Sequence, residues 1–237
     1  MSILRFFSKP KKIKPYGWDI HSHILTGIDD VPDTINEYIE RIKSLIEIGF
    51  TKFICTPHTM SDFFKNTSGT ISKTLGTLKS AVKVEKLNIQ LKFAAEYYLD
   101  KGFIEKLENK DLLTFSNNYL LFETSYINKP NNLKEVIFKI ITNGYKTVLA
   151  HPERYTYMFN DFNKYKELYN TGVLFQINVN SLTGYYSKVV EQIIDNNMTD
   201  FFGSDCHKPK HVEIMQKAMA SKYYSKALSM NLLNYSL

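Results

Sequence analysis

The stretch YGWDIHSHILTGIDDVPDTINEYIERIKSLIEIGFTKFICTPH, residues 16–58, places a helical segment between two short apolar runs. The apolar side chains of the middle segment, residues 34–48, recur every three or four positions, as in an amphipathic helix. They are Ile35, Tyr38, Ile39, Ile42, Leu45 and Ile46. We expect this helix to begin near Asp30 or Asp33, beside Pro32, and to end at Gly49. A strand, a helix and a second strand in this order indicate two parallel strands joined by a right-handed crossover.

The same alternation continues along the chain. Apolar runs typical of strands occur at residues 16–21, 51–56, 89–95, 119–123, 146–150, 173–179 and 200–203, with segments of helical length between them. Residues 133–141, followed by Gly144, repeat the helical pattern, whereas Gly69 and Gly76 weaken it in residues 67–87. Because no linker or repeat interrupts the 237 residues, we predict one α/β domain, and a barrel of alternating strands and helices is ordinary at this length.

Composition excludes several classes of protein. A hydrophobic content of 43% and a charged content of 23% are values of a globular chain. The net charge of +6 comes partly from four lysines near the N-terminus, so we interpret residues 1–15 as a basic, solvated tail and residues 16–237 as the domain. The tail could make a weak contact with acidic lipid or an acidic partner. Without a zinc-finger spacing or an RNA-binding aromatic motif, nucleic-acid binding is not indicated.

The sequence also indicates a compartment. The first residues contain no uninterrupted apolar segment typical of a signal peptide, and no run approaches the ~20 apolar residues of a transmembrane segment. The two cysteines, Cys55 and Cys206, cannot form a disulfide framework and fit a reducing environment. We therefore expect a cytoplasmic protein without a transmembrane segment.

Polar side chains that can bind metals stand where the strand-like runs end. They are His21, His23, His58, Glu96, Glu123, His151, Asp205 and His207, and five of the six histidines are among them. We expect the remaining one, His211, to be an exposed helix histidine. Because the carboxyl ends of parallel strands converge on one face of a barrel, these residues should gather into one cluster.

Imidazoles and carboxylates together suit Zn²⁺, Mn²⁺ or Fe²⁺, and a carboxylate can bridge two ions ~3.5–4 Å apart in hydrolytic sites. Each residue alone has a structural alternative: His58 could cap a helix, Glu96 could be a surface charge, Glu123 could form an ion pair, and His151 could donate to the backbone. All of them at strand ends favour a shared metal site, because buried polar groups need partners.

The motifs that carry these residues are DIHSHIL (19–25), GIDD (27–30), TPH (56–58), AEY (95–97), FE (122–123), AHPERY (150–155), NSLTGYY (180–186) and GSDCH (203–207). In their order and spacing they resemble the polymerase-and-histidinol-phosphatase (PHP) metallophosphoesterases. Within that family they resemble the bacterial tyrosine-protein phosphatases of capsular and exopolysaccharide operons. The resemblance spans almost the whole chain and implies a distorted (β/α)7 TIM-like barrel of the PHP type.

The resemblance also implies three divalent metal ions per chain, with manganese favoured and iron or zinc as alternatives. The first ion would be held by His21, His23, Glu96 and Asp205. Glu96 would bridge to a second ion held with Glu123 and His151, and a third would be held by His58 and His207 with Asp30. Arg154 would contact the substrate phosphate, for which a guanidinium fork is well suited. Lys208 and Lys210 stand where relatives carry an arginine, and either lysine could bind phosphate as a point charge.

The implied reaction is hydrolysis of phosphotyrosine by a metal-activated hydroxide, with Asp205 or His207 passing a proton to the leaving oxygen. The substrate would be the tyrosine-rich tail of a membrane-bound kinase that controls polysaccharide synthesis. One alternative is hydrolysis of a small phosphate monoester such as histidinol phosphate, and another is a regulatory module that binds metal without turnover. A cysteine mechanism is not indicated, because Ser61 and Val212, six positions after the two cysteines, stand where an arginine is required.

Overall fold

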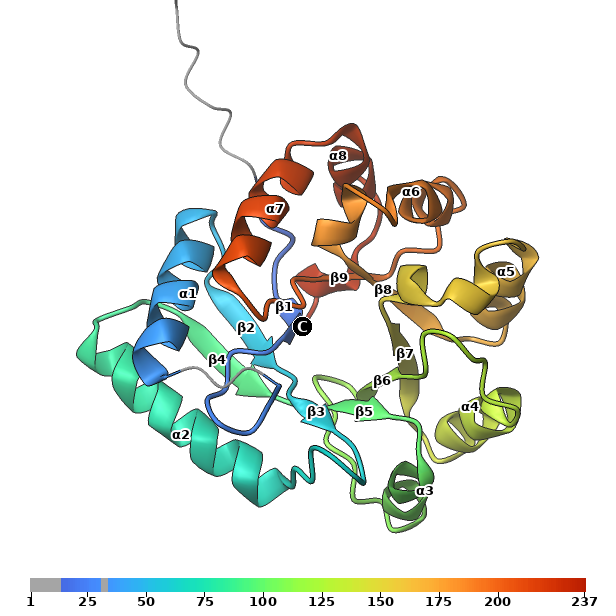
Figure 1. Ribbon diagram of the computed structural model, residues 1–237, viewed down its shortest axis with the longest axis horizontal. Helices are drawn as coiled ribbons and strands as arrows, with labels where there is room; N and C mark the ends of the chain where they lie inside the picture. Colours follow the sequence, from blue (N-terminus) through green and yellow to red (C-terminus); the bar gives the residue numbers. More distant parts are fainter. Residues whose placement is uncertain (1–13, 31–33) are drawn as a thin grey trace, which may run out of the picture.

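The computed structural model describes residues 14–30 and 34–237. Within these ranges, nine parallel strands form two sheets, in the orders β1-β2-β4 and β3-β5-β6-β7-β8-β9. The strands are β1 (Asp19–Ser22), β2 (Lys52–Cys55), β3 (His58–Thr59), β4 (Gln90–Phe93), β5 (Glu96–Tyr98), β6 (Tyr119–Glu123), β7 (Lys146–Ala150), β8 (Leu174–Asn178) and β9 (Phe201–Gly203). A parallel bridge between Ser22 and Cys206 connects β1 to the segment after β9, and the strands curve around a common centre (Figure 1). The α/β prediction is confirmed.

Helices surround the strands on the outside (Figure 1). They are α1 (Ile35–Glu47), α2 (Ser68–Val84), α3 (Lys101–Glu108), α4 (Leu133–Thr142), α5 (Asn163–Asn170), α6 (Ser187–Asp195), α7 (Pro209–Met219) and α8 (Lys222–Leu228). Short 3-10 turns lie at η1 (Pro152–Arg154), η2 (Thr156–Met158), η3 (Val179–Leu182) and η4 (Leu233–Tyr235). None of the helices in the described part of the chain is long and apolar enough to cross a membrane.

The N-cap of the first helix is Thr34, the first residue of the predicted helical segment, and not Asp30. Thr34 caps α1: its hydroxyl accepts from the amide of Glu37, whose carboxylate accepts from the amide of Thr34. This reciprocal capping box satisfies backbone donors that Asp30 is too far upstream to reach. Asp33 and Pro32 lie outside the described residues, as do residues 1–13 of the predicted tail. The end at Gly49 is confirmed, and Gly49 adopts a φ of 103°.

Two predicted strands are each divided in two. The runs 51–56 and 89–95 contain β2 and β4, and each continues after a short break as β3 or β5. The first pieces pair with each other beside β1, while the second pieces pair with each other and β5 then pairs with β6. His58 and Glu96 therefore begin the second pieces instead of ending the first. This break moves both side chains toward the centre of the curved sheets.

A small apolar cluster fills the interior below the functional residues. It is made of Trp18, Ile20, Ile54, Ala94, Phe115, Tyr119, Leu121, Val148, Ala150 and Phe201. Alternate side chains of a strand share a face, so the residue two positions after an inward apolar residue also points inward. Ala94 is followed in this way by Glu96, and Leu121 by Glu123. The polar layer thus continues the inner face of the sheets at their carboxyl ends.

Candidate metal centre

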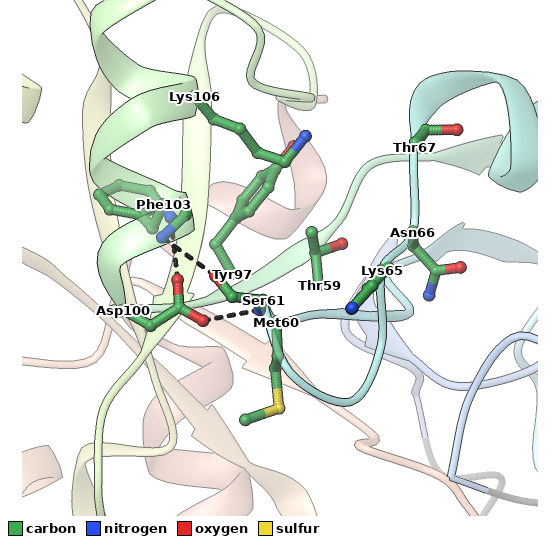
Figure 2. Close-up of a pocket in the computed structure, with 11 residues that line it drawn as sticks. Thr59, Met60, Ser61, Lys65, Asn66, Thr67, Tyr97, Asp100, Phe103 and Lys106 are labelled. Carbon is green, nitrogen blue, oxygen red and sulfur yellow. Dashed lines mark hydrogen bonds between the residues drawn. The ribbon is translucent and has the colours of Figure 1, made fainter.

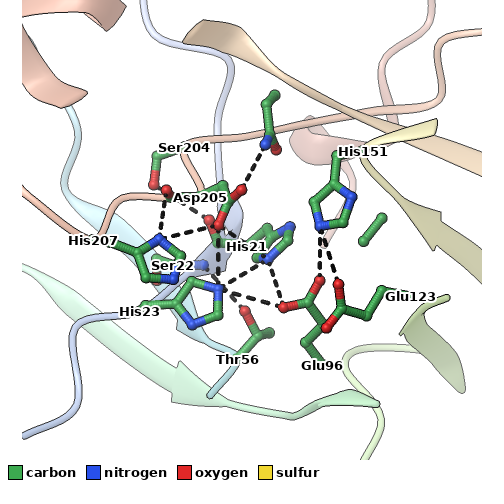
Figure 3. Close-up of polar contacts among 12 residues, drawn as sticks. His21, Ser22, His23, Thr56, Glu96, Glu123, His151, Ser204, Asp205 and His207 are labelled. Carbon is green, nitrogen blue, oxygen red and sulfur yellow. Dashed lines mark hydrogen bonds and ion pairs between the residues drawn. The ribbon is translucent and has the colours of Figure 1, made fainter. Parts of the chain in front are cut away.

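All eight of the residues predicted at strand ends lie close together at the carboxyl ends of the strands, and all of them except His58 are labelled in Figure 3. They lie in β1, β3, β5 and β6 and in the segments that directly follow β1, β7 and β9. His151 directly follows β7 and has a left-handed backbone with a φ of 35°. Asp205 lies just after β9 and is also left-handed, with a φ of 47°. At β9, Gly203 allows close packing, because a Cβ there would lie 2.6 Å from the Cβ of His21.

The first group of donors is His21, His23, Glu96 and Asp205, as expected. The two Nε2 atoms of His21 and His23 lie 3.0 Å apart, and His21 Nε2 lies 3.2 Å from Glu96 Oε2. Asp205 Oδ1 lies 3.3 Å from His23 Nε2 and 3.6 Å from His21 Nε2. Four donor atoms therefore face the same small volume.

The second group is centred on the other side of Glu96. Glu96 Oε1 lies 3.1 Å from His151 Nε2, and Glu123 Oε2 lies 3.8 Å from the same nitrogen. His58 belongs here as well: its Nδ1 lies 3.0 Å from Glu96 Oε2 and 3.3 Å from Glu123 Oε1. Glu96 thus uses both oxygens toward different imidazoles, as the proposed bridging role requires.

A third group contains His23, His58 and His207, whose ring nitrogens lie within 4.8 Å of one another. Asp30 Oδ1 lies 3.2 Å from His207 Nε2, although its side chain is 44% exposed. The neighbouring Asp29 was not among the predicted ligands. Its Oδ2 lies 2.8 Å from His23 Nδ1, and it accepts from the amide of His58.

The donor set fits divalent ions better than a hydrogen-bonded polar core. Glu96 Oε2 and His58 Nδ1 are buried and lie 3.0 Å apart, yet neither makes a hydrogen bond of acceptable geometry. The facing Nε2 atoms of His21 and His23 could share at most one proton. Buried atoms without hydrogen bonds are costly, and a cation between them would satisfy them all. Imidazole and carboxylate donors match Mn²⁺, Fe²⁺ or Zn²⁺.

Opposite charges shift the pKa values in this cluster. Burial disfavours the charged form of His23, but the surrounding carboxylates, Asp29 first, outweigh it and raise its pKa to about 10. Burial also opposes protonation of His58, and the carboxylates of Glu96 and Glu123 raise its pKa to about 12. Burial opposes ionisation of Glu96, yet the nearby imidazoles lower its pKa well below the usual range. In the absence of a metal ion, protonated imidazoles therefore neutralise the negative charge of the buried carboxylates.

Loading the metal-depleted protein with Mn²⁺ at about pH 7 is expected to release protons, because an imidazole nitrogen must be deprotonated to bind metal. His23 and His58, with pKa values of about 10 and about 12, hold protons at this pH. The apparent affinity should therefore rise with pH, since competition by protons weakens as the pH approaches those values. Calorimetric titrations in two buffers of different ionisation enthalpy measure the release, and identical heats in both would contradict this prediction.

Further polar residues orient these donors. Gln176 Oε1 lies 2.7 Å from His21 Nδ1 and accepts from the amide of His151, so one side chain orients donors from two strands. Asn178 donates to Asp205 Oδ2 at 2.6 Å and accepts from Gln176 Nε2 at 2.9 Å. Sequence reasoning missed both. Two buried amides in the otherwise apolar run of β8 were the available signal.

Arg154 lies at the edge of the cluster in η1. Its Nη1 donates to Asp205 Oδ2 at 3.1 Å, and its guanidinium lies over the ring of Tyr126, 4.4 Å from the centroid. Burial opposes its charge, but Asp205 and the other nearby anions raise its pKa further. With 31% of its side chain exposed, the arginine can reach an anion that approaches from solvent.

In the segment from the end of β9 into α7, one prediction is wrong and another is not tested. His211 is half-buried instead of exposed, because its Nδ1 accepts from the amide of His207 at 3.3 Å beside the carbonyl of Asp205. It thereby helps to hold the loop that carries both of these residues. Lys208 and Lys210 lie exposed at the start of α7, and contact with a phosphate stays a prediction for each.

A separate pocket of about 230 Å³ lies between the loops after β3 and β5 (Figure 2). Thr59 and Tyr97, which line it, directly follow the donors His58 and Glu96 in their strands. Neighbouring residues of a strand point to opposite faces, so this pocket lies behind the strands and not among the donors. The amide of Gly102, at the start of α3, donates to the hydroxyl of Ser61 and closes the pocket.

Residues 17–233 match the family described as "Capsular polysaccharide synthesis, CpsB/CapC". The chain belongs to this family. Its sequence is 30% identical over 222 residues to CapC of Staphylococcus aureus, which covers 92% of this chain and 87% of that protein. It is 27% identical over 199 residues to CpsB of Streptococcus agalactiae serotype V, which is named a tyrosine-protein phosphatase. This match covers 80% of this chain and 82% of that protein. The resemblance seen in the sequence motifs is confirmed.

The fold agrees with a solved member of the CpsB/CapC group. A chain from crystal structures of YwqE from Bacillus subtilis and CpsB from Streptococcus pneumoniae, described as unique metal-dependent tyrosine phosphatases, superposes with a TM-score of 0.76. The match covers 92% of this chain and 94% of the other at 22% identity. At this identity the likeness shows the shared α/β fold of parallel strands.

In this CpsB/CapC chain both cysteines are buried behind the donors. Burial raises the pKa of Cys206 to about 12 and that of Cys55 higher still, so neither is a thiolate at neutral pH. The double substitution Cys55→Ser, Cys206→Ser should therefore retain much of the phosphatase activity, while a chelator abolishes it and Mn²⁺ restores it. A folded but inactive double variant, together with a chelator-resistant wild type, would show that the metal assignment is wrong.

Proposed function

We propose that this protein is a metal-dependent phosphatase that hydrolyses phosphotyrosine in proteins. The observation that carries the proposal is the convergence of five imidazoles and three carboxylates, with Arg154 beside them, at the carboxyl ends of parallel strands. The names of relatives such as CpsB of Streptococcus agalactiae and the metal dependence described for YwqE and CpsB support it.

We further propose that three divalent ions bind, most favourably Mn²⁺, with Fe²⁺ or Zn²⁺ as alternatives. The first would be held by His21, His23, Glu96 and Asp205, the second by Glu96, Glu123 and His151, and the third by His58, His207 and Asp30. The position of His58 near both carboxylates of the second group supports a share in that ion as well. When bound, such ions polarise phosphoryl oxygens and lower the pKa of water.

Arg154 would bind the non-bridging oxygens of the phosphate. Its guanidinium is rigid, carries donors in a fork and is partly exposed beside the cluster. Asp205 holds one of its nitrogens, so the remaining donors are directed outward. Lys208 and Lys210 could add positive charge at the rim, but only as flexible point charges.

The surroundings of Asp205 and His207 favour a role as metal ligands over transfer of a proton to the leaving group. Burial opposes ionisation of Asp205, but the nearby imidazoles lower its pKa well below the usual range. Burial and the positive charge of His23 lower the pKa of His207 to about 3. These shifts favour an ionised Asp205 and a neutral His207, the forms that bind metal ions. A tyrosine phenolate, with a pKa near ~10, also needs less help from a proton donor to leave than an alkoxide does. We therefore assign both to holding the site.

The remaining proposals concern the surroundings of the site. The ring of strands, closed by the Ser22–Cys206 bridge, supports classification as a distorted (β/α)7 barrel of the PHP type that spans residues 16–237. Membership in a capsular polysaccharide family supports a cytoplasmic protein that acts on the tyrosine-rich tail of a membrane-bound kinase. The basic residues 1–15 would make at most a weak peripheral membrane contact.

The test is a comparison of substrates with the purified, Mn²⁺-loaded protein. We expect hydrolysis of a phosphotyrosine peptide at a kcat/KM well above that for histidinol phosphate, and loss of both activities with a chelator. A preference for histidinol phosphate would favour a small-molecule phosphatase. Metal binding without turnover of either substrate would favour a regulatory module.

A further inference from the structure

Tyr126 touches three functional side chains at once. It lies three residues after Glu123, in the loop that follows β6. Its hydroxyl donates to Glu123 Oε2 at 2.9 Å, and its ring lies under the guanidinium of Arg154 at 4.4 Å. The ring also meets the imidazole of His151 edge to face, with centroids 5.5 Å apart.

The backbone of Tyr126 is fixed to the loop that carries Arg154. Its carbonyl accepts from the amide of Thr156 at 2.8 Å and from the hydroxyl of Thr156 at 2.9 Å. Thr156 lies two residues after Arg154, so the loops after β6 and β7 are held together at this point. The half-buried ring is thereby positioned by both loops.

The hydroxyl determines how the Glu123 carboxylate is turned. With Oε2 bonded to the phenol, Oε2 lies 3.8 Å from His151 Nε2 and Oε1 lies 3.3 Å from His58 Nδ1. Without this hydrogen bond the carboxylate could rotate about its last torsion. Partners of this kind orient metal ligands, and their loss typically weakens metal affinity.

The ring determines the plane of the Arg154 guanidinium. One nitrogen is held by Asp205 at 3.1 Å, and the aromatic face supports the flat side of the group. Stacking of this kind stabilises arginine without occupying its donors. The free donors can then face an anion.

We propose that Tyr126 is a positioning residue with two separable roles: its hydroxyl orients Glu123 toward a metal ion, and its ring orients Arg154 toward the substrate phosphate. The proposal rests on the proposed function for the identity of these two ligands. Nothing in it requires Tyr126 to react with the substrate.

Two variants separate the roles. Tyr126→Phe keeps the ring and removes the hydroxyl, so Mn²⁺ affinity, measured by competition with a chromogenic chelator, should fall roughly 10–100-fold. Its affinity for inorganic phosphate at saturating Mn²⁺, measured by calorimetry, should stay at the wild-type value. Tyr126→Leu removes the ring too, so phosphate affinity should then fall about 3- to 30-fold.

Tyr157→Phe is the matched control, because it removes a half-buried hydroxyl in the next loop that contacts Thr124 at 3.4 Å. Both of its affinities should equal those of the wild type. Wild-type Mn²⁺ affinity in Tyr126→Phe, or wild-type phosphate affinity in Tyr126→Leu, would overturn the proposal. Should Tyr126→Leu fail to fold, the Tyr126→Phe arm still decides the role of the hydroxyl. Absence of phosphotyrosine turnover in the wild type would refute the proposed function, while both affinities would still test Tyr126.

Discussion

Replacement of Glu96 with alanine is expected to reduce phosphotyrosine hydrolysis by more than the roughly 10²–10³-fold that loss of a single oxyanion donor causes. The side chain is fully buried, and its oxygens lie 3.2 Å from His21 Nε2, 3.0 Å from His58 Nδ1 and 3.1 Å from His151 Nε2. No other carboxylate in the described part of the chain contacts all three of these imidazoles. Its removal should therefore lower both kcat/KM and the number of ions bound per chain.

Tyr97→Phe provides the control for this prediction. Tyr97 is the next residue of β5, but it points to the opposite face, where its hydroxyl accepts from the amide of Leu113 at 2.8 Å. Loss of that bond should cost about 1 kcal/mol of stability and leave the site intact. Equal, mild effects of Glu96→Ala and Tyr97→Phe on kcat/KM would remove Glu96 from the metal centre.

Arg154→Lys is expected to lower kcat/KM by about 10²–10³-fold with the charge retained, because lysine offers no guanidinium fork. The structure adds a second reason. An ammonium group cannot both stack flat on the Tyr126 ring and donate to Asp205 as the guanidinium does at 4.4 Å and 3.1 Å. Steady-state kinetics with a phosphotyrosine peptide at saturating Mn²⁺ measure the loss.

Lys210→Ala distinguishes this assignment from its competitor. Lys210 is exposed at the start of α7, so its removal should have a much smaller effect than Arg154→Lys. If Lys210→Ala abolished activity while Arg154→Lys matched the wild type, the phosphate contact would belong to the last loop instead.

Local patterns in the sequence predicted much of the fold. The runs at Tyr119–Glu123 and Lys146–Ala150 are strands with the predicted limits, because each contains a short apolar stretch with polar residues at or beside its ends. Residues 67–87 contain α2 despite Gly69 and Gly76, since Thr67 caps it and buried residues such as Ile71 and Leu78 recur at helical spacing. Tertiary packing of this apolar face outweighs the helix propensity that the glycines cost.

The breaks between β2 and β3 and between β4 and β5 could not be read from the sequence. They depend on which distant strand each half pairs with, and the periodicity of such short runs, residues 51–56 and 89–95, carries no such information. The same limit applies within the site. Nothing local distinguishes Asp29 from Asp30, whereas in the folded loop Asp29 reaches His23 and Asp30 reaches His207. Grouping the donors by strand ends succeeded because parallel strands bring their carboxyl ends to one face.

The number of divalent ions bound per chain shows whether the clustered histidines and carboxylates form a metal centre. The protein would be loaded with Mn²⁺, passed through a desalting column and analysed by plasma mass spectrometry against a protein concentration from amino-acid analysis. We expect more than one ion per chain in the wild type and in Arg154→Lys, and fewer in Glu96→Ala. A correctly folded wild type that retained no divalent ion after loading with Mn²⁺, Fe²⁺ or Zn²⁺ would contradict this expectation.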